Sequence, residues 1–179
     1  MAHTSKIMPV QIKTPTGASD SIRSFVFGLA DLTSIGYKNI ENAEQLYRDR
    51  LQMWKKAIQR MRIEKSNALL RWKLGKEIVT FFNVLKEKYS ITITNKVEAI
   101  ALDLKISETT VSSIIKMAER FTESEVKEFG FNWSKFNELL RTNDTQKMNE
   151  CIKLIKSGKI KYDSQIREFL KGQSNFVLH

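Results

Sequence analysis

The 179-residue sequence has few of the residues that most enzyme centres require. It contains one cysteine, Cys151, and two histidines, His3 and His179, which stand near the two ends. A single thiol excludes an intrachain disulfide, and neither histidine has neighbours suited to metal ligation or acid–base work. Apolar residues at helical spacing around Cys151 indicate a buried, inert thiol. We therefore expect a non-enzymatic protein with no catalytic residue, no metal site and no cofactor.

Proline and glycine are also scarce, with two prolines, both before residue 16, and seven glycines in the whole chain. Little beyond residue 16 interrupts helix formation, and alternating strand-like runs are rare. No run of eighteen apolar residues occurs, so we expect no membrane-spanning segment. These absences predict an all-α fold. The lone cysteine and the lack of an apolar signal core favour a cytoplasmic protein.

The chain divides into four predicted regions. Residues 1–18 and 173–179 are predicted tails, residues 19–90 form a helical N-terminal region, and residues 91–172 form a compact domain of short helices. A short helix is predicted over residues 20–35 and a long basic helix from about residue 40 to 89, with a break at Gly75 or at residues 65–67. The apolar stripe of the long helix includes Trp54 and Met61, which need cover from a partner helix. This stripe predicts either a dimer or packing against the helix at 20–35.

Residues 95–121 have the pattern of a helix-turn-helix. Val97, Ile100, Ala101 and Leu104 share one face of a first helix, and Lys105 stands in the turn where a positive φ is expected. Ser107 is a predicted N-cap for a second helix over residues 107–121. Its buried face is predicted to hold Val111, Ile114, Ile115 and Ala118. In such motifs the second helix enters the DNA major groove.

The polar face of this second helix supplies the predicted contacts with DNA. The residues expected to reach base edges or nearby phosphates are Ser107, Glu108, Thr109, Thr110, Ser112, Ser113 and Lys116. The residues expected to hold the DNA backbone are Lys96, Lys105, Arg120, Arg60, Arg62, Lys65, Arg71, Lys73 and Lys76. The alternative for the motif is a helical hairpin used only for packing, and the alternative for the basic residues is a solvated helix face.

The positive charge lies mainly outside the motif. The chain carries a net charge of +10, which favours polyanionic partners. Residues 41–90 hold twelve Lys and Arg against six Asp and Glu, whereas residues 96–120 hold four against four. Phosphate contacts supply affinity and base contacts supply sequence choice. We therefore expect the long basic helix to grip the DNA and the motif to select the sequence.

The order of the later segments resembles the DNA-binding domain of ParB and KorB-type partition proteins. The similarity covers residues of about 93–171. It is carried by VEAIALDLKISETTVSSIIKMAERF, by FNWSKFNELLRTND and by MNECIKLIKSGKIKYDSQIREFL. Trp133, Ser134 and Leu139 match the middle segment of that family, and Gly158 and Ser164 match the last. The resemblance implies sequence-specific binding of double-stranded DNA in plasmid or viral partition or in transcriptional regulation, at a nucleoid or plasmid, as a homodimer and with a partition ATPase as an eventual partner.

The first 90 residues depart from the ParB pattern. They lack the strands and the arginine-bearing phosphate motif of its nucleotide-binding domain, so nucleotide-dependent clamp loading is not implied. The segment LLRWKLGKEIVTFF instead resembles the helical N-terminal domain of an uncharacterised family of nuclease-associated proteins. Two further functions stay open from the residues alone. One is a non-catalytic adaptor whose long helix is a protein–protein interface, and the other is RNA binding by the basic helix.

Overall fold

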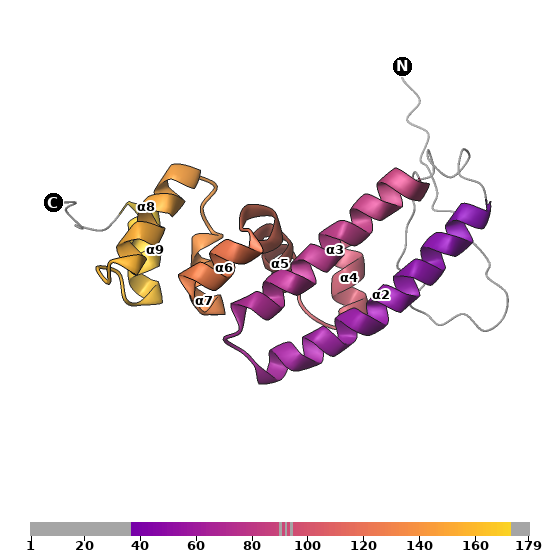
Figure 1. Ribbon diagram of the computed structural model, residues 1–179, viewed down its shortest axis with the longest axis horizontal. Coiled ribbons are helices and arrows are strands. Elements are labelled where there is room, and N and C mark those ends of the chain that lie inside the picture. The colour runs from indigo at the N-terminus through magenta and orange to yellow at the C-terminus, as the bar shows by residue number, and fades with distance from the viewer. Residues whose placement is uncertain (1–36, 90, 92, 94, 173–179) are drawn as a thin grey trace, which may run out of the picture. The chain divides into compact units, whose positions relative to one another are not determined.

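The computed structural model describes residues 37–89, 91, 93 and 95–172, and their secondary structure is helical (Figure 1). The helices are α2 (Tyr37–Ile63), α3 (Ala68–Tyr89), α4 (Lys96–Leu104), α5 (Glu108–Arg120), α6 (Glu123–Phe129), α7 (Trp133–Leu139), α8 (Thr145–Lys156) and α9 (Asp163–Lys171). The predicted all-α class is confirmed. The helix predicted over residues 20–35 and both predicted tails lie outside the described residues.

The chain forms two compact units that interleave along the sequence. The described residues of the first unit come from 37–58 and 77–112, and those of the second come from 59–76 and 113–172. The predicted boundary at about residue 90, between a helical N-terminal region and a compact domain, stays a prediction. The two units are described separately below.

The predicted long helix is broken at residues 64–67, the second of the two positions that the sequence suggested. Asn67 ends the break, because its side-chain oxygen accepts from the Leu70 amide at 2.9 Å and so caps α3. The Asn67 amide group also donates to the Glu64 carboxylate at 2.6 Å. Gly75 lies inside α3 and does not interrupt it.

In the first unit, α3 covers the apolar stripe of α2, and the two helix segments lie side by side (Figure 1). Trp54 is 1% exposed and meets the Phe81 ring edge-on at 5.4 Å between centroids. Arg50 pairs with Glu77 at 2.7 Å between the same two helices. A segment about 27 residues further along the chain thus covers Trp54, and the predicted packing against a second chain or against the helix at 20–35 stays a prediction.

Helix α4 is tied to α2 by a polar contact within the same unit. The Tyr47 hydroxyl donates to the Asp103 carboxylate, which comes from α4. Burial, followed by this hydrogen bond and the adjacent negative charge, raises the pKa of Tyr47 well above its ordinary value. The phenol therefore stays protonated and available as a donor at any physiological pH.

The second unit is a bundle of short helices around one apolar core, which contains Phe136, Leu139, Cys151 and Ile166. Side chains cap the starts of several helices in this unit. Thr122 and Glu125 form a capping box for α6, and side chains of Asn132 and Asp144 cap α7 and α8. Positive φ values occur at Gly130, Gly158 and Gly172. Helix α9 begins at Asp163, and Tyr162 precedes it as the cap residue.

A buried carboxylate, which was not predicted from the sequence, joins α7 to α9. Glu138 is 5% exposed. Its two oxygens accept from Arg167, at 2.8 Å from Nη2 and 3.2 Å from Nε, and Arg141 pairs with it at 3.0 Å. A fork of two hydrogen bonds from one guanidinium is a strong, directional contact. Glu138 therefore fixes the orientation of α9 against α7.

Candidate nucleic-acid interface

Helices α4 and α5 are joined by a tight turn in which Lys105 adopts the left-handed conformation, with a φ of 53°. The Lys105 amide donates to the Leu102 carbonyl at 3.2 Å, and the Ile106 amide donates to the Ala101 carbonyl at 3.1 Å. Left-handed backbone costs a residue with a side chain about 1–2 kcal/mol. The predicted turn with a positive φ at Lys105 is confirmed.

Ser107 directly precedes α5 and caps it, as predicted. Its hydroxyl accepts from the Thr110 amide at 3.2 Å, and its carbonyl accepts from the Val111 amide at 3.1 Å. The Ser107 and Thr110 hydroxyls also lie 2.8 Å apart. These contacts satisfy amides that the first turn of a helix otherwise leaves without partners. The N-terminal turn of α5 is therefore held in one conformation by its own side chains.

The two faces of α5 differ as the sequence predicts. The buried face consists of Val111, Ile114, Ile115, Met117 and Ala118. On the polar face Ser107, Glu108, Thr109 and Lys116 are exposed, whereas Thr110, Ser112 and Ser113 are half-buried. All seven predicted base-contacting residues thus lie on or at the start of one helix. The Thr110 hydroxyl contacts the Ser107 hydroxyl and is therefore engaged within the protein.

In the second unit, Gly75 allows α3 to approach the backbone of α5 directly. A Cβ atom at position 75 would lie 2.2 Å from the Ile114 carbonyl oxygen and 2.9 Å from the Ala118 Cβ. Close by, the Trp72 indole donates to the Phe121 carbonyl at 2.7 Å, just after the end of α5. These contacts position the C-terminal half of α5 from its buried side. The sequence predicts Gly75 as one of two possible breaks in the long helix, although a small residue inside a helix is also a signal for close helix contact.

Most of the predicted backbone-contacting residues of the second unit are exposed to solvent. Arg60, Arg62 and Lys65 gather at the α2–α3 turn, and Lys73 and Lys76 lie on α3. Arg60 is partly neutralised by Glu64, which lies 3.1 Å away. The turn itself is rigid, since the Trp133 amide donates to the Ser66 carbonyl at 3.0 Å.

The prediction that Arg71 contacts DNA is corrected. Arg71 is 8% exposed and its guanidinium donates to the carbonyls of Asn67, at 3.1 Å, and Glu64, at 3.5 Å. It also lies over the Trp133 ring, 5.0 Å from the centroid. Burial lowers the pKa of Arg71 from its ordinary value. Arg71 therefore stabilises the α2–α3 turn, and its buried guanidinium is not accessible to a DNA phosphate.

Two other predicted backbone contacts are partly occupied within the protein. Arg120 donates to the Thr142 carbonyl at 2.5 Å and to the Asn143 side chain at 2.6 Å, beside a hollow of about 210 Å³. Lys96, in the first unit, is half-buried with its amine 5.4 Å from the centre of the Phe82 ring. Arg120 therefore supports the segment before α8. Lys105, by contrast, is exposed.

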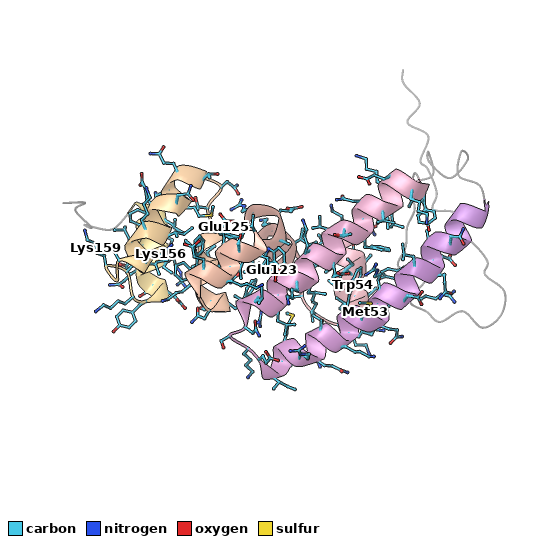
Figure 2. The ribbon with its side chains drawn as sticks, viewed as in Figure 1. Met53, Trp54, Glu123, Glu125, Lys156 and Lys159 are labelled. Carbon is cyan, nitrogen blue, oxygen red and sulfur yellow. The ribbon has the colours of Figure 1, made fainter. Side chains whose placement is uncertain are left out.

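Helix α6 carries two acidic residues near its start, Glu123 and Glu125, which Figure 2 labels. Glu123 pairs with Lys127 at 2.7 Å, and this bond, with weaker contributions from the charges of Lys127 and Lys73, lowers the pKa of Glu123. Glu125 accepts from the Thr122 amide at 2.7 Å. Over the described residues, no three His, Cys, Asp or Glu side chains are grouped closely enough to hold a metal ion. Both carboxylates therefore stabilise helix α6.

Comparisons with protein-family models, curated proteins and solved structures find no match to this chain. The resemblance to ParB and KorB-type proteins therefore stays a prediction from the sequence. Across the part of the chain that the structure describes, no helix combines the length and the apolarity needed to cross a lipid bilayer.

Proposed function

We propose that this protein binds double-stranded DNA at specific sequences and that α5 enters the major groove. The observation that supports this most directly is the polar face of α5. Serine, threonine and lysine side chains stand on a helix whose opposite face is fully buried and whose first turn is capped by Ser107. Such a helix can approach base edges without first becoming ordered, which keeps the entropic cost of recognition low.

Affinity is assigned to basic residues outside the motif. The exposed residues Arg60, Arg62, Lys65, Lys73 and Lys76 are the best candidates for phosphate contacts in the second unit. A protein of net charge +10 attracts DNA at long range, and each neutralised phosphate releases counterions. Binding should consequently weaken steeply as the salt concentration rises.

The biological setting rests on the ParB-like order of segments in residues 93–171. A centromere-binding role in plasmid or viral partition and a role in transcriptional regulation both use this chemistry. Recognition by a homodimer would double the contacts made by one motif on a site with repeated halves. We therefore propose a homodimer that acts in one of these two settings. The proposal includes a partition ATPase as a partner and a location at the nucleoid or on a plasmid.

Selection of bound fragments from random or genomic DNA tests the proposal. A recovered motif of defined length supports sequence-specific binding, and two copies at a fixed spacing support the homodimer. Recovery of unrelated fragments would refute sequence-specific binding.

Sedimentation with and without duplex DNA, over a series of salt concentrations, separates the proposed function from the adaptor alternative. Salt-independent oligomers that do not shift with DNA would favour an adaptor. Competition by duplex RNA, with no effect of duplex DNA, would assign the basic helix to RNA.

A further inference from the structure

The turn between α8 and α9 is the most strongly basic short segment of the second unit. Residues 153–162 include Lys153, Lys156, Lys159 and Lys161 and contain no acidic residue. All four lysines are exposed. Figure 2 labels Lys156 and Lys159, which come from the end of α8 and from the turn that follows it. None of these lysines belongs to the predicted DNA-binding set.

The four lysines differ in how they are used. Lys156 pairs with Glu128 at 2.6 Å and lies over the Phe129 ring, so it joins α8 to α6. Within the described residues, the ammonium groups of Lys153, Lys159 and Lys161 have no ion-pair partner. Three unneutralised charges on one turn repel each other, which a partner with several negative charges would relieve.

The backbone of this turn is rigid. The Ile160 amide donates to the Leu154 carbonyl at 3.1 Å, and the Ile160 side chain, at 1% exposure, anchors the turn in the core. The Gln165 side chain accepts from the amides of Lys161, at 2.8 Å, and Tyr162, at 3.1 Å. The lysines on either side of Ile160 are thus presented from fixed backbone positions, which lowers the entropic cost of binding.

An exposed aromatic ring adjoins the basic residues. Tyr162 is 68% exposed, an unusual exposure for so large a side chain, and directly follows Lys161. Tyrosine hydroxyls and lysine amines are both common contacts of the DNA sugar–phosphate backbone. An anionic membrane would also attract lysines, but the turn carries only one exposed ring and no exposed aliphatic side chain to enter the lipid.

From this arrangement we propose that Lys153, Lys159, Lys161 and Tyr162 form a second contact surface for the phosphate backbone of duplex DNA. We call these four residues the lysine turn. The inference rests on the proposed DNA-binding function and extends it, because it places a sequence-independent contact far along the chain from α5. Each lysine that neutralises a phosphate adds about 0.9 to the slope of log affinity against log salt.

The test compares two matched double variants of the full chain on the selected site and on a scrambled duplex. Lys159→Gln with Lys161→Gln should lower the salt slope by about 1.8 on both duplexes. Lys86→Gln with Lys88→Gln removes the same charge from exposed positions at the end of α3, and should leave most of the slope unchanged because neither residue belongs to the predicted backbone-contacting set. Lys159→Arg with Lys161→Arg should restore the wild-type slope, because arginine keeps the charge.

Tyr162→Ala should weaken binding to both duplexes without changing the salt slope, because the phenol is uncharged. An unchanged slope in the Lys159/Lys161 variant, or an equal loss in the Lys86/Lys88 variant, would overturn the proposal. Loss of binding to anionic vesicles with an unchanged slope on DNA would assign the lysine turn to a membrane and would also overturn it.

Failure of the lysine turn can be separated from failure of the recognition helix. The Lys159/Lys161 variant should preserve the ratio of affinities for the selected and scrambled duplexes, whereas changes on α5 should reduce that ratio. A wild-type protein with no sequence preference would refute recognition by α5 and still allow the salt slope to test the lysine turn.

Discussion

Replacing Gly75 by alanine should destabilise the second unit even though alanine is the better helix former. The added methyl group would lie 2.2 Å from the Ile114 carbonyl oxygen, so α3 and α5 must separate by about 1 Å to restore ordinary van der Waals contact. Such overpacking costs up to about 3 kcal/mol, whereas the gain in helix propensity from glycine to alanine is about 1 kcal/mol. We expect the free energy of unfolding to fall by about 2 kcal/mol.

Urea denaturation followed by circular dichroism measures this change. Asn83→Ala is the matched control, because Asn83 is exposed on the same helix and its replacement improves helix propensity without adding a contact. The control should be stabilised by up to about 0.7 kcal/mol. If Gly75→Ala is as stable as the wild type or more stable, the close approach of α3 to α5 is wrong.

Three further predictions follow from individual contacts. Lys105→Gly should raise the free energy of unfolding by about 1 kcal/mol, because glycine adopts the left-handed backbone without strain. The control Lys105→Gln keeps the strain and should leave the free energy of unfolding unchanged. Thermal denaturation of both variants measures the difference. Glu138→Gln should lower the free energy of unfolding in urea by about 2 kcal/mol, because it breaks the buried pair of hydrogen bonds with Arg167. The control Glu128→Gln, in an exposed ion pair, should lower it by less than about 0.5 kcal/mol. Equal losses in the two variants would contradict the structural role of Glu138. Burial raises the pKa of Cys151 to about 12, so the folded protein should resist thiol alkylation at pH 8 and react only on unfolding. An unfolded thiol ionises near pH 8.5. The contribution of Cys151 to the free energy of unfolding should therefore be complete below about pH 8.5 and be lost as the pH rises toward 12.

Short-range features of the fold were predictable from the sequence. Helix caps act within three or four residues, so the cap at Ser107 could be recognised without any knowledge of tertiary contacts. The left-handed turn at Lys105 followed from the spacing of the apolar residues on each side of it. The break at residues 64–67 was one of two alternatives, because propensity alone does not separate a helix end from a glycine inside a helix.

Features that depend on which helices touch could not be predicted in this way. The acceptors for Arg167 lie 29 residues away in Glu138, and nothing local to either residue indicates a buried pair. The cover of Trp54 by Phe81 likewise depends on α2 and α3 folding back on each other. The burial of Arg71 had a signal that was overlooked, because Ala68, Arg71, Gly75 and Ile78 recur at the spacing of one helix face.

The central claim is that α5 selects the DNA sequence, and the ratio of affinities for the selected and scrambled duplexes tests it most directly. Thr109→Ala with Lys116→Gln changes two exposed residues of α5, and Ser124→Ala with Lys127→Gln makes the same kinds of change on the exposed face of α6. Each base-edge contact that is lost costs about 1–3 kcal/mol of discrimination. We predict that the ratio of affinities falls at least about tenfold in the α5 variant and stays at the wild-type value in the α6 variant. An unchanged ratio in the α5 variant would contradict the assignment of α5 as the recognition helix.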